Sequence, residues 1–384
     1  MKKCPYSTWC GGCKYQGIAY SEQLLMKQDR AEKLLSSFHH VETILACARQ
    51  DHYRNKVQIS FGTDEDHHVL CGYYLPDSHR ILPIDGCDLA DERIDKLIFS
   101  LKRIVIRDRI PVYDERKKKG CLRHILIRTS NTGGSMIVFV TASRTLYKAE
   151  QLVKDVLRYN PDVTTIVHNI NEAPTSKVLG RKSFTLYGKG YITDELCGLS
   201  FRISPSSFYQ VNAYQTQVLY EEAIRLAELN ENEILIDAYC GTGTIGLAAS
   251  RSVKKVIGVE INESAVKDAL INRRINGIQN AEFITGDAGK YMETLSHQKA
   301  HIDAVFMDPP RSGSDKRFLS SLMKLSPDKV IYISCNPDTL RRDLQQLQKA
   351  YTVERIQPVD MFPFTEHIEC IVKLLRKTGD KFHK

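Results

Sequence analysis

The feature that most constrains this chain is a regular alternation of strand-like and helix-like segments that begins near residue 230. Short runs of Val, Ile and Ala alternate with longer amphipathic stretches, which predicts a doubly wound α/β fold with a mostly parallel sheet. The expected strands cover residues 234–237, 255–259, 281–285, 302–307 and 329–333, and a final strand pair covers 353–359 and 368–375. Ligands bind where the carboxyl ends of such strands meet, so we expect the functional site there.

Polar and reactive residues follow several of these strands. Cys335 comes directly after the fifth strand and precedes a helix-like segment, whose N-terminus favours a nucleophilic thiolate over the thiol. The alternative is a small buried side chain that closes the strand. Because Glu260, Asp287 and Asp308 follow three other strands, the sequence favours a reactive role for Cys335.

The first strand runs into a glycine-rich turn, D-A-Y-C-G-T-G-T, at residues 237–244. Glycines there allow a ligand to approach the backbone closely, and Glu260 after the second strand is placed to bind two ribose hydroxyls. Asp237 before the turn suits a cationic ligand better than a pyrophosphate. With the final strand pair this favours S-adenosylmethionine, whose adenine Asp287 is placed to reach. The alternative is an iron–sulfur oxidoreductase with a dinucleotide site.

The turn D-P-P-R at residues 308–311 points to the atom that is methylated. Amino-group methyltransferases usually carry an aromatic residue where this chain has Arg311, and here the next strand delivers a cysteine. This combination favours methylation at carbon, in which thiolate addition to C6 of uracil makes C5 nucleophilic. A base must then remove the C5 proton. Glu369 is the candidate base, and Glu366 is its local competitor.

The N-terminus is rich in cysteine. Three of the eleven cysteines form the pattern C-x5-C-x2-C, at Cys4, Cys10 and Cys13, with glycines between them. Thiols this close together predict a metal site, and zinc and an iron–sulfur cluster both take four thiolates. The best candidate for the fourth ligand is Cys87, ahead of Cys71 and Cys121.

The net charge of +8 is concentrated in one segment. Residues 101–128 hold ten Lys or Arg and three Asp or Glu, a net +7, which indicates either phosphate contacts or a solvated face. The chain has no apolar run of the ~18 residues that a membrane span needs, and no apolar stretch follows the N-terminal lysines. We therefore expect a cytoplasmic protein with no membrane partner and no obligate protein partner.

Five motifs together resemble the RNA uracil-5-methyltransferases over nearly the whole chain. They are F-x-I-S-P-x-S-F-Y-Q-V-N at 201–212, the turn at 237–244, D-P-P-R at 308–311, S-C-N-P at 334–337 and D-M-F-P at 360–363. The resemblance implies a Rossmann-like class I S-adenosylmethionine-dependent methyltransferase domain at 201–384. It also implies a central α+β RNA-binding domain at 51–200 and an iron–sulfur segment at 1–50 and around residue 87.

The resemblance also implies residue roles. Cys335 stands at the position of the nucleophile, and Glu369 stands at the position of the base. The implied S-adenosylmethionine contacts are Gln210, Tyr239, Thr244, Glu260 and Asp308, although Thr244 stands where asparagine is common. The implied ligands of a [4Fe-4S] cluster, with zinc as the alternative, are Cys4, Cys10, Cys13 and Cys87. We expect this cluster to be architectural, because the methyl transfer moves no electrons.

The four cysteines resemble those of the ribosomal-RNA members of the family, of the RlmC/RlmD type, and the sequence leaves no room for a TRAM domain before Cys4. We therefore expect methylation of 23S rRNA to 5-methyluridine, with the uridine left open. The alternative substrate is tRNA, at a uridine-54-type position. A non-catalytic RNA-binding factor is a further alternative, but it would need neither Cys335 nor the D-P-P-R turn.

Overall fold

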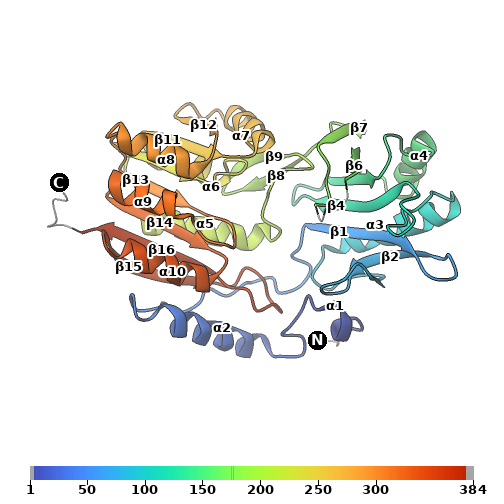
Figure 1. The fold of residues 1–384 in the computed structure, drawn as a ribbon, viewed down its shortest axis with the longest axis horizontal. Helices are drawn as coiled ribbons and strands as arrows, with labels where there is room; N and C mark the ends of the chain where they lie inside the picture. Colours follow the sequence, from blue (N-terminus) through green and yellow to red (C-terminus); the bar gives the residue numbers. More distant parts are fainter. Residues whose placement is uncertain (1–3, 174, 176, 378–384) are drawn as a thin grey trace.

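The computed structural model describes residues 4–173, 175 and 177–377. It contains two seven-stranded sheets and a two-stranded hairpin, and helices pack against both large sheets (Figure 1).

The C-terminal sheet has the strand order β12-β11-β10-β13-β14-β16-β15. Its first five strands are parallel, and β16 and β15 are antiparallel to their neighbours. This confirms the predicted α/β fold with a closing strand pair. The strands are β10 (Ile234–Ala238), β11 (Lys255–Glu260), β12 (Ala281–Thr285), β13 (Ala304–Met307), β14 (Lys329–Ser334), β15 (Tyr351–Val359) and β16 (Glu369–Arg376).

Helices cover both faces of this sheet because its strands are apolar on both sides. Leu235 belongs to the core under one set of helices, and the next residue, Ile236, belongs to the core under the other set. Asn or Asp side chains cap five of these helices, where each accepts a hydrogen bond from a backbone N–H of the first turn. The helices are α5 (Ala213–Ala227), α6 (Thr244–Ala249), η1 (Ser250–Ser252), α7 (Glu263–Ile275), α8 (Ala288–His297), α9 (Lys316–Leu325) and α10 (Pro337–Leu347).

The N-terminal segment packs against the C-terminal domain, and it also contributes residues to the cysteine pocket described below. It contains α1 (Ser7–Cys10) and α2 (Tyr20–Leu35), and α2 packs against α10 (Figure 1). Residues 41–45 then run parallel to β15, with bridges from Val41 to Ile356 and from Leu45 to Val359. The N-terminal segment therefore extends the C-terminal sheet at its β15 edge.

The central region is built on a mixed sheet with the order β3-β2-β1-β4-β5-β6-β7, in which only the β5–β6 pair is parallel among the described strands. Two helices, α3 (Glu92–Arg107) and α4 (Ala149–Tyr159), cover one face. The strands are β1 (Lys56–Thr63), β2 (Val69–Tyr74), β3 (Ile81–Pro83), β4 (Leu122–Thr129), β5 (Ser135–Thr141), β6 (Val163–Ile170) and β7 (Lys182–Gly188), and the hairpin is β8 (Ile192–Leu196) with β9 (Leu199–Ile203).

Within the residues that the structure describes, no helix is both long enough and apolar enough to span a bilayer.

Candidate active site

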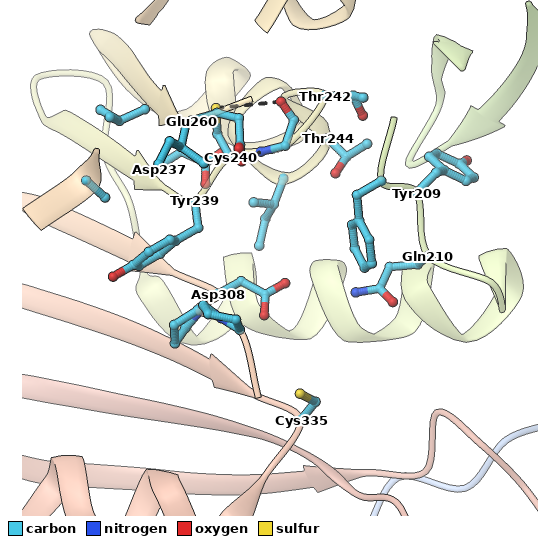
Figure 2. Close-up of a pocket in the computed structure, with 18 of the residues that line it drawn as sticks. Tyr209, Gln210, Asp237, Tyr239, Cys240, Thr242, Thr244, Glu260, Asp308 and Cys335 are labelled. Carbon is cyan, nitrogen blue, oxygen red and sulfur yellow. Dashed lines mark hydrogen bonds between the residues drawn. The ribbon is translucent and has the colours of Figure 1, made fainter. Parts of the chain in front are cut away.

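A cavity of about 580 Å³ lies at the carboxyl ends of the parallel strands, where the sequence predicted the functional site. Figure 2 shows side chains from the turn after β10, from Asp308 after β13 and from Cys335 after β14 around this cavity. All seven residues to which the sequence assigned a catalytic or cofactor-binding role line it, namely Gln210, Tyr239, Thr244, Glu260, Asp308, Cys335 and Glu369. Asp287 lines it too.

The turn after β10 adopts the backbone that its glycines permit. Gly241 and Gly243 have φ values of 54° and 79°, and Tyr239 shares this left-handed conformation at 65°. The turn thereby presents the Gly241 N–H to Glu260 Oε2 at 3.1 Å, while the Asn262 N–H donates to Glu260 Oε1 at 2.8 Å. Two backbone donors thus fix the Glu260 carboxylate at the cavity wall.

Two buried carboxyls give the cavity its electrostatic character. Burial raises the pKa of Asp308 to about 7 and the pKa of Asp237 to about 8, although the Gly246 N–H donates to Asp237 at 3.0 Å. Among the residues that the structure describes, no cationic side chain forms an ion pair with either carboxyl, and a cation in the cavity would stabilise the charged form. The arrangement therefore suits a cationic ligand, as the position of Asp237 predicted.

Cys335 and Glu369 lie opposite each other at the end of an antiparallel strand pair. The ladder between β14 and β16 ends with Ser334 opposite Cys370, and the residues one step further are Cys335 and Glu369. Both residues line the cavity. By contrast, the competing carboxylate Glu366 is partly exposed and forms a 2.6 Å ion pair with Lys14 outside the cavity.

The surroundings of Cys335 oppose the thiolate that the N-terminus of the following helix was predicted to favour. Burial and the nearby carboxyls of Glu369 and Asp308 raise the pKa of the Cys335 thiol to about 11. Arg311 opposes this shift, and it also opposes the upward shift that burial gives the pKa of Glu369. The thiol therefore needs a base or a bound ligand to lose its proton.

Gln210 is held by the central region. Its carbonyl accepts a 3.1 Å hydrogen bond from the Asn55 side chain, and the Asn55 N–H donates to the Val211 carbonyl at 2.8 Å. The start of the same loop is bound to α7, where Asp268 accepts hydrogen bonds from the Ser204 hydroxyl at 2.8 Å and from the Ser207 hydroxyl at 2.5 Å. Both halves of the molecule thus fix the loop that carries Gln210 into the cavity.

Several lining residues had no assigned role in the sequence interpretation, and four of them have large side chains that bear on the chemistry of the cavity. Tyr220 on α5 shares a 3.2 Å hydrogen bond with the Thr244 hydroxyl, and Phe362 belongs to the loop before β16. Arg311 is the one basic side chain among the described residues that line the cavity, and Phe208 is 59% exposed at its edge. Motifs at 201–212, 308–311 and 360–363 contain three of these residues, but Tyr220 lies on a helix with no sequence signal for function.

A second pocket gathers the four cysteines that the sequence grouped together. Cys4, Cys10, Cys13 and Cys87 line it along with Tyr73 and Phe364, whereas the weaker candidates Cys71 and Cys121 are buried in the core of the central region. The chain thus brings Cys87 to the N-terminal motif. In the described part of the chain, however, no group of three or more Cys, His, Asp or Glu side chains is arranged to hold a metal ion, so a metal site is not shown.

The basic segment at 101–128 is not one continuous surface. Arg123 and Arg128 are buried, and they donate to the backbone carbonyls of Asn171 and Ser207. Arg107 pairs with Asp108 and Asp155. Of the two interpretations of this segment, phosphate contacts or a solvated face, neither applies to Arg123 and Arg128, because their guanidinium groups are buried and bound to backbone carbonyls.

The comparisons agree with this geometry. The sequence model of the tRNA (uracil-5-)-methyltransferase family matches residues 19–377. An uncharacterized RNA methyltransferase of Oceanobacillus iheyensis is 40% identical over 379 residues, covering 97% of this chain and 82% of that protein. One of Clostridium tetani is 40% identical over 384 residues, covering 98% of this chain and 83% of that protein.

Among solved structures, the tRNA (uracil-54, C5)-methyltransferase of Pyrococcus abyssi, in complex with S-adenosyl-L-homocysteine, is 27% identical with a TM-score of 0.78. The match covers 95% of this chain and 86% of that one. With the family match over residues 19–377, the chain belongs to the tRNA (uracil-5-)-methyltransferase family.

Proposed function

We propose that this protein transfers a methyl group from S-adenosylmethionine to C5 of a uridine in 23S rRNA, giving 5-methyluridine. The observation that carries the proposal is the convergence of Cys335 and Glu369 with the five predicted cofactor residues in one cavity. The complex of the Pyrococcus abyssi enzyme with S-adenosyl-L-homocysteine supports the choice of cofactor.

S-adenosylmethionine supplies an electrophilic methyl group on a sulfonium cation. Glu260, fixed by two backbone donors, is placed to accept hydrogen bonds from the ribose hydroxyls. The buried carboxyls of Asp237 and Asp308 attract the positive charge, and the cation in turn lowers their pKa. Gln210 and Tyr239 line the same cavity and complete the set of residues that we assign to the cofactor.

Cys335 activates the uracil. Its thiol loses a proton, and the thiolate forms a bond to C6 while the electrons of the C5–C6 double bond shift toward the C4 carbonyl. C5 of this adduct is nucleophilic and takes the methyl group, and the S–CH3 bond of the sulfonium breaks to leave S-adenosylhomocysteine. Arg311, which favours the negative form of Cys335, is the cationic side chain placed to stabilise the thiolate.

Glu369 completes the reaction by removing the proton from C5. The electron pair of the C5–H bond then restores the C5–C6 double bond, and the bond between Cys335 and C6 breaks to regenerate the thiolate. A buried carboxylate is a stronger base than an exposed one, and burial raises the pKa of Glu369 well above its usual value. Its position opposite Cys335 supports this role.

The substrate test compares two RNA classes, because the structural relative from Pyrococcus abyssi is a tRNA enzyme. Labelled methyl transfer from S-adenosylmethionine to unmodified 23S rRNA and to unmodified tRNA is measured, and the product is mapped. We expect 5-methyluridine in 23S rRNA. Label in tRNA alone would keep the chemistry and replace the substrate, and label in neither would contradict the proposed function.

We also propose that Cys4, Cys10, Cys13 and Cys87 bind a [4Fe-4S] cluster. A zinc ion needs four sulfurs at about 2.3 Å from one centre, and the described thiols are not arranged around a single ion. A cluster places iron and sulfide atoms between four thiolate ligands, and these four cysteines line one pocket. An RNA substrate and these free thiols are consistent with the predicted cytoplasmic location.

Iron and sulfide analysis of anaerobically purified protein tests this second proposal. We expect about four of each per chain, and we expect Cys87→Ser to lose them. Cys121→Ala is the matched control, because Cys121 lies outside the pocket. One zinc ion per chain, or iron that survives Cys87→Ser, would contradict the cluster.

A further inference from the structure

A further cavity, of about 460 Å³, lies on the central region between α3 and the end of α4. Both helices pack on the face of the central sheet that carries Ile125 and Ile137, whereas Leu126 and Met136 on the opposite face join the core shared with the C-terminal domain. Figure 1 shows α3 and α4 at the end of the molecule away from the C-terminal sheet. None of the residues that line this cavity takes part in the proposed reaction.

Its lining combines exposed aromatic rings with cations. Phe99 on α3 is 55% exposed and Tyr159 at the end of α4 is 54% exposed. The Arg103 guanidinium lies 5.6 Å from the centre of the Phe99 ring, and the Arg107 guanidinium lies 5.7 Å from that of Tyr159. Two large rings are therefore half exposed at one cavity and open to a flat ligand.

Acidic side chains neutralise only part of the positive charge at this cavity. Arg107 is bound by the carboxylates of Asp108 and Asp155. In contrast, no acidic side chain within 4.0 Å pairs with Lys96 or Arg103 among the residues that the structure describes, and both line the cavity. The Lys96–Arg103 end therefore carries uncompensated positive charge beside the Phe99 ring.

This combination matches single-stranded RNA. Bases stack on exposed aromatic rings irrespective of sequence, and neighbouring Lys and Arg side chains bind the phosphates. An acidic peptide would match the cations, but it has no flat group to cover the Phe99 and Tyr159 rings. The chemistry of the lining therefore favours an unpaired nucleotide.

The cavity is connected to the active site through α3. Asp91 caps α3 and accepts a 3.2 Å hydrogen bond from the Thr129 hydroxyl, and the Thr129 N–H donates to the Asn55 carbonyl at 2.8 Å. Asn55 in turn binds the carbonyl of Gln210. With a rise of 1.5 Å per residue, Arg103 lies about 18 Å along α3 from this point.

The intervening face of α3 is polar and basic. Spacings of three and four residues place one set of side chains on a single helix face, namely Arg93, Lys96, Ser100, Arg103 and Arg107. Arg93 is itself bound to Asp91 and to the Ser130 carbonyl. An RNA strand that leaves the active site along this face meets Lys96 and Arg103 next to Phe99.

We propose that the cavity between α3 and α4 binds an unpaired nucleotide of the RNA substrate outside the active site. This inference rests on the proposed function, because it takes the methylated RNA as the ligand. Lys96 and Arg103 bind its phosphates, and Phe99 and Tyr159 stack with its base.

The test measures RNA affinity directly, by fluorescence anisotropy with 23S rRNA and tRNA transcripts, for four variants. We expect the double variant Lys96→Glu/Arg103→Glu to weaken binding at least tenfold, and to flatten the log–log dependence on salt by about 1.4, for two phosphate contacts. Phe99→Ala should weaken binding about fivefold or more. The controls are Lys324→Glu on α9 and Ile106→Ala, an exposed apolar side chain of α3 that does not line the cavity.

Unchanged RNA affinity in the double variant and in Phe99→Ala, with methyl transfer by the wild type intact, would overturn this inference and leave the proposed function standing. If the wild type methylates no RNA, the proposed function fails, and the binding measurement still decides the cavity by itself. Photocrosslinking of a 4-thiouridine transcript adds an independent readout. We expect crosslinks in the peptides that contain Phe99 or Tyr159, and crosslinks confined to the active-site peptides would contradict the inference.

Discussion

The active-site cavity and the cysteine pocket are assembled in opposite ways. The cavity collects residues from the ends of successive strands of one parallel sheet, so the order of the chain already brings them together. The cysteine pocket joins an N-terminal motif to Cys87, more than seventy residues later. The first site follows from sheet topology, whereas the second depends on a contact between distant segments that no periodicity encodes.

One loop contributes to both regions. Phe362 lines the active-site cavity, and Phe364, two residues later, lines the cysteine pocket. The loop is anchored by Asp360, which is fully buried with Lys27 of α2 at 2.7 Å and accepts from the Tyr20 hydroxyl at 2.9 Å. Changes in one region can therefore reach the other through residues 360–368, and the predictions below separate direct effects from effects through this loop.

The largest expected effect belongs to the active-site cavity alone. Cys335→Ala removes the nucleophile, and we expect methyl transfer to fall on the order of 10⁴-fold or more. Binding of S-adenosylmethionine, measured by calorimetry, should persist because Glu260 and Asp308 are unchanged. Turnover that survives in Cys335→Ala would refute the covalent mechanism.

The next effect concerns the opposite side chain of the strand pair. Glu369→Gln keeps the shape but removes the base, and we expect turnover to fall about 10²–10⁴-fold. Because proton removal follows methyl transfer, the methylated RNA should remain attached to the protein, and denaturing gel electrophoresis detects the adduct. Glu366→Gln is the matched control with near-normal turnover, since Glu366 pairs with Lys14 outside the cavity. Full activity of Glu369→Gln would reassign the base.

A third prediction breaks the link between the two regions. Lys27→Met leaves the Asp360 carboxylate buried without its cation, and we expect the free energy of unfolding to fall by about 3–5 kcal/mol. The double variant Lys27→Met/Asp360→Leu should recover part of this loss, because it removes both charges. Urea unfolding followed by circular dichroism measures the effect. An equal loss in both variants would show that the ion pair does not hold the loop.

The smallest effect is a pH dependence of cofactor affinity. The sulfonium cation favours ionised Asp308, whose pKa burial raises to about 7, so affinity should rise as pH increases through 7. For one such group the expected change between pH 6 and pH 8 is about tenfold. Calorimetric titration with S-adenosylmethionine checks this, and Asp308→Asn should flatten the profile. Affinity that falls over this range would contradict the electrostatic account of the cavity.

The sequence was a good guide to the C-terminal half because its signals are local there. Apolar runs ending in Glu260, Asp308 and Cys335 predicted both the strands and the residues that meet at their ends. In the central region no expectation covered α3 or the β6–β7 pair, although the buried side chains of α3, such as Ile94, Leu97 and Leu101, recur at the three- and four-residue spacing of a helix. The pKa of Cys335 was also not predictable, since its burial beside Glu369 is a property of the folded chain.

The basic segment at 101–128 shows the same limit of prediction from sequence. In the sequence Arg123 and Arg128 look like the exposed Lys118 and Lys119, yet the fold buries the two arginines against backbone carbonyls. Burial depends on which face of β4 meets the rest of the protein, and a count of charges does not contain that information.

The most direct test of the central claim is to identify the atom that bonds to RNA. A transcript containing 5-fluorouridine has no C5 proton to remove, so with S-adenosylmethionine it should trap the covalent adduct, which mass spectrometry maps after digestion. We predict the adduct on Cys335. An adduct on Cys240, the other thiol that lines the cavity, or no adduct under conditions that methylate the unmodified transcript, would contradict the account.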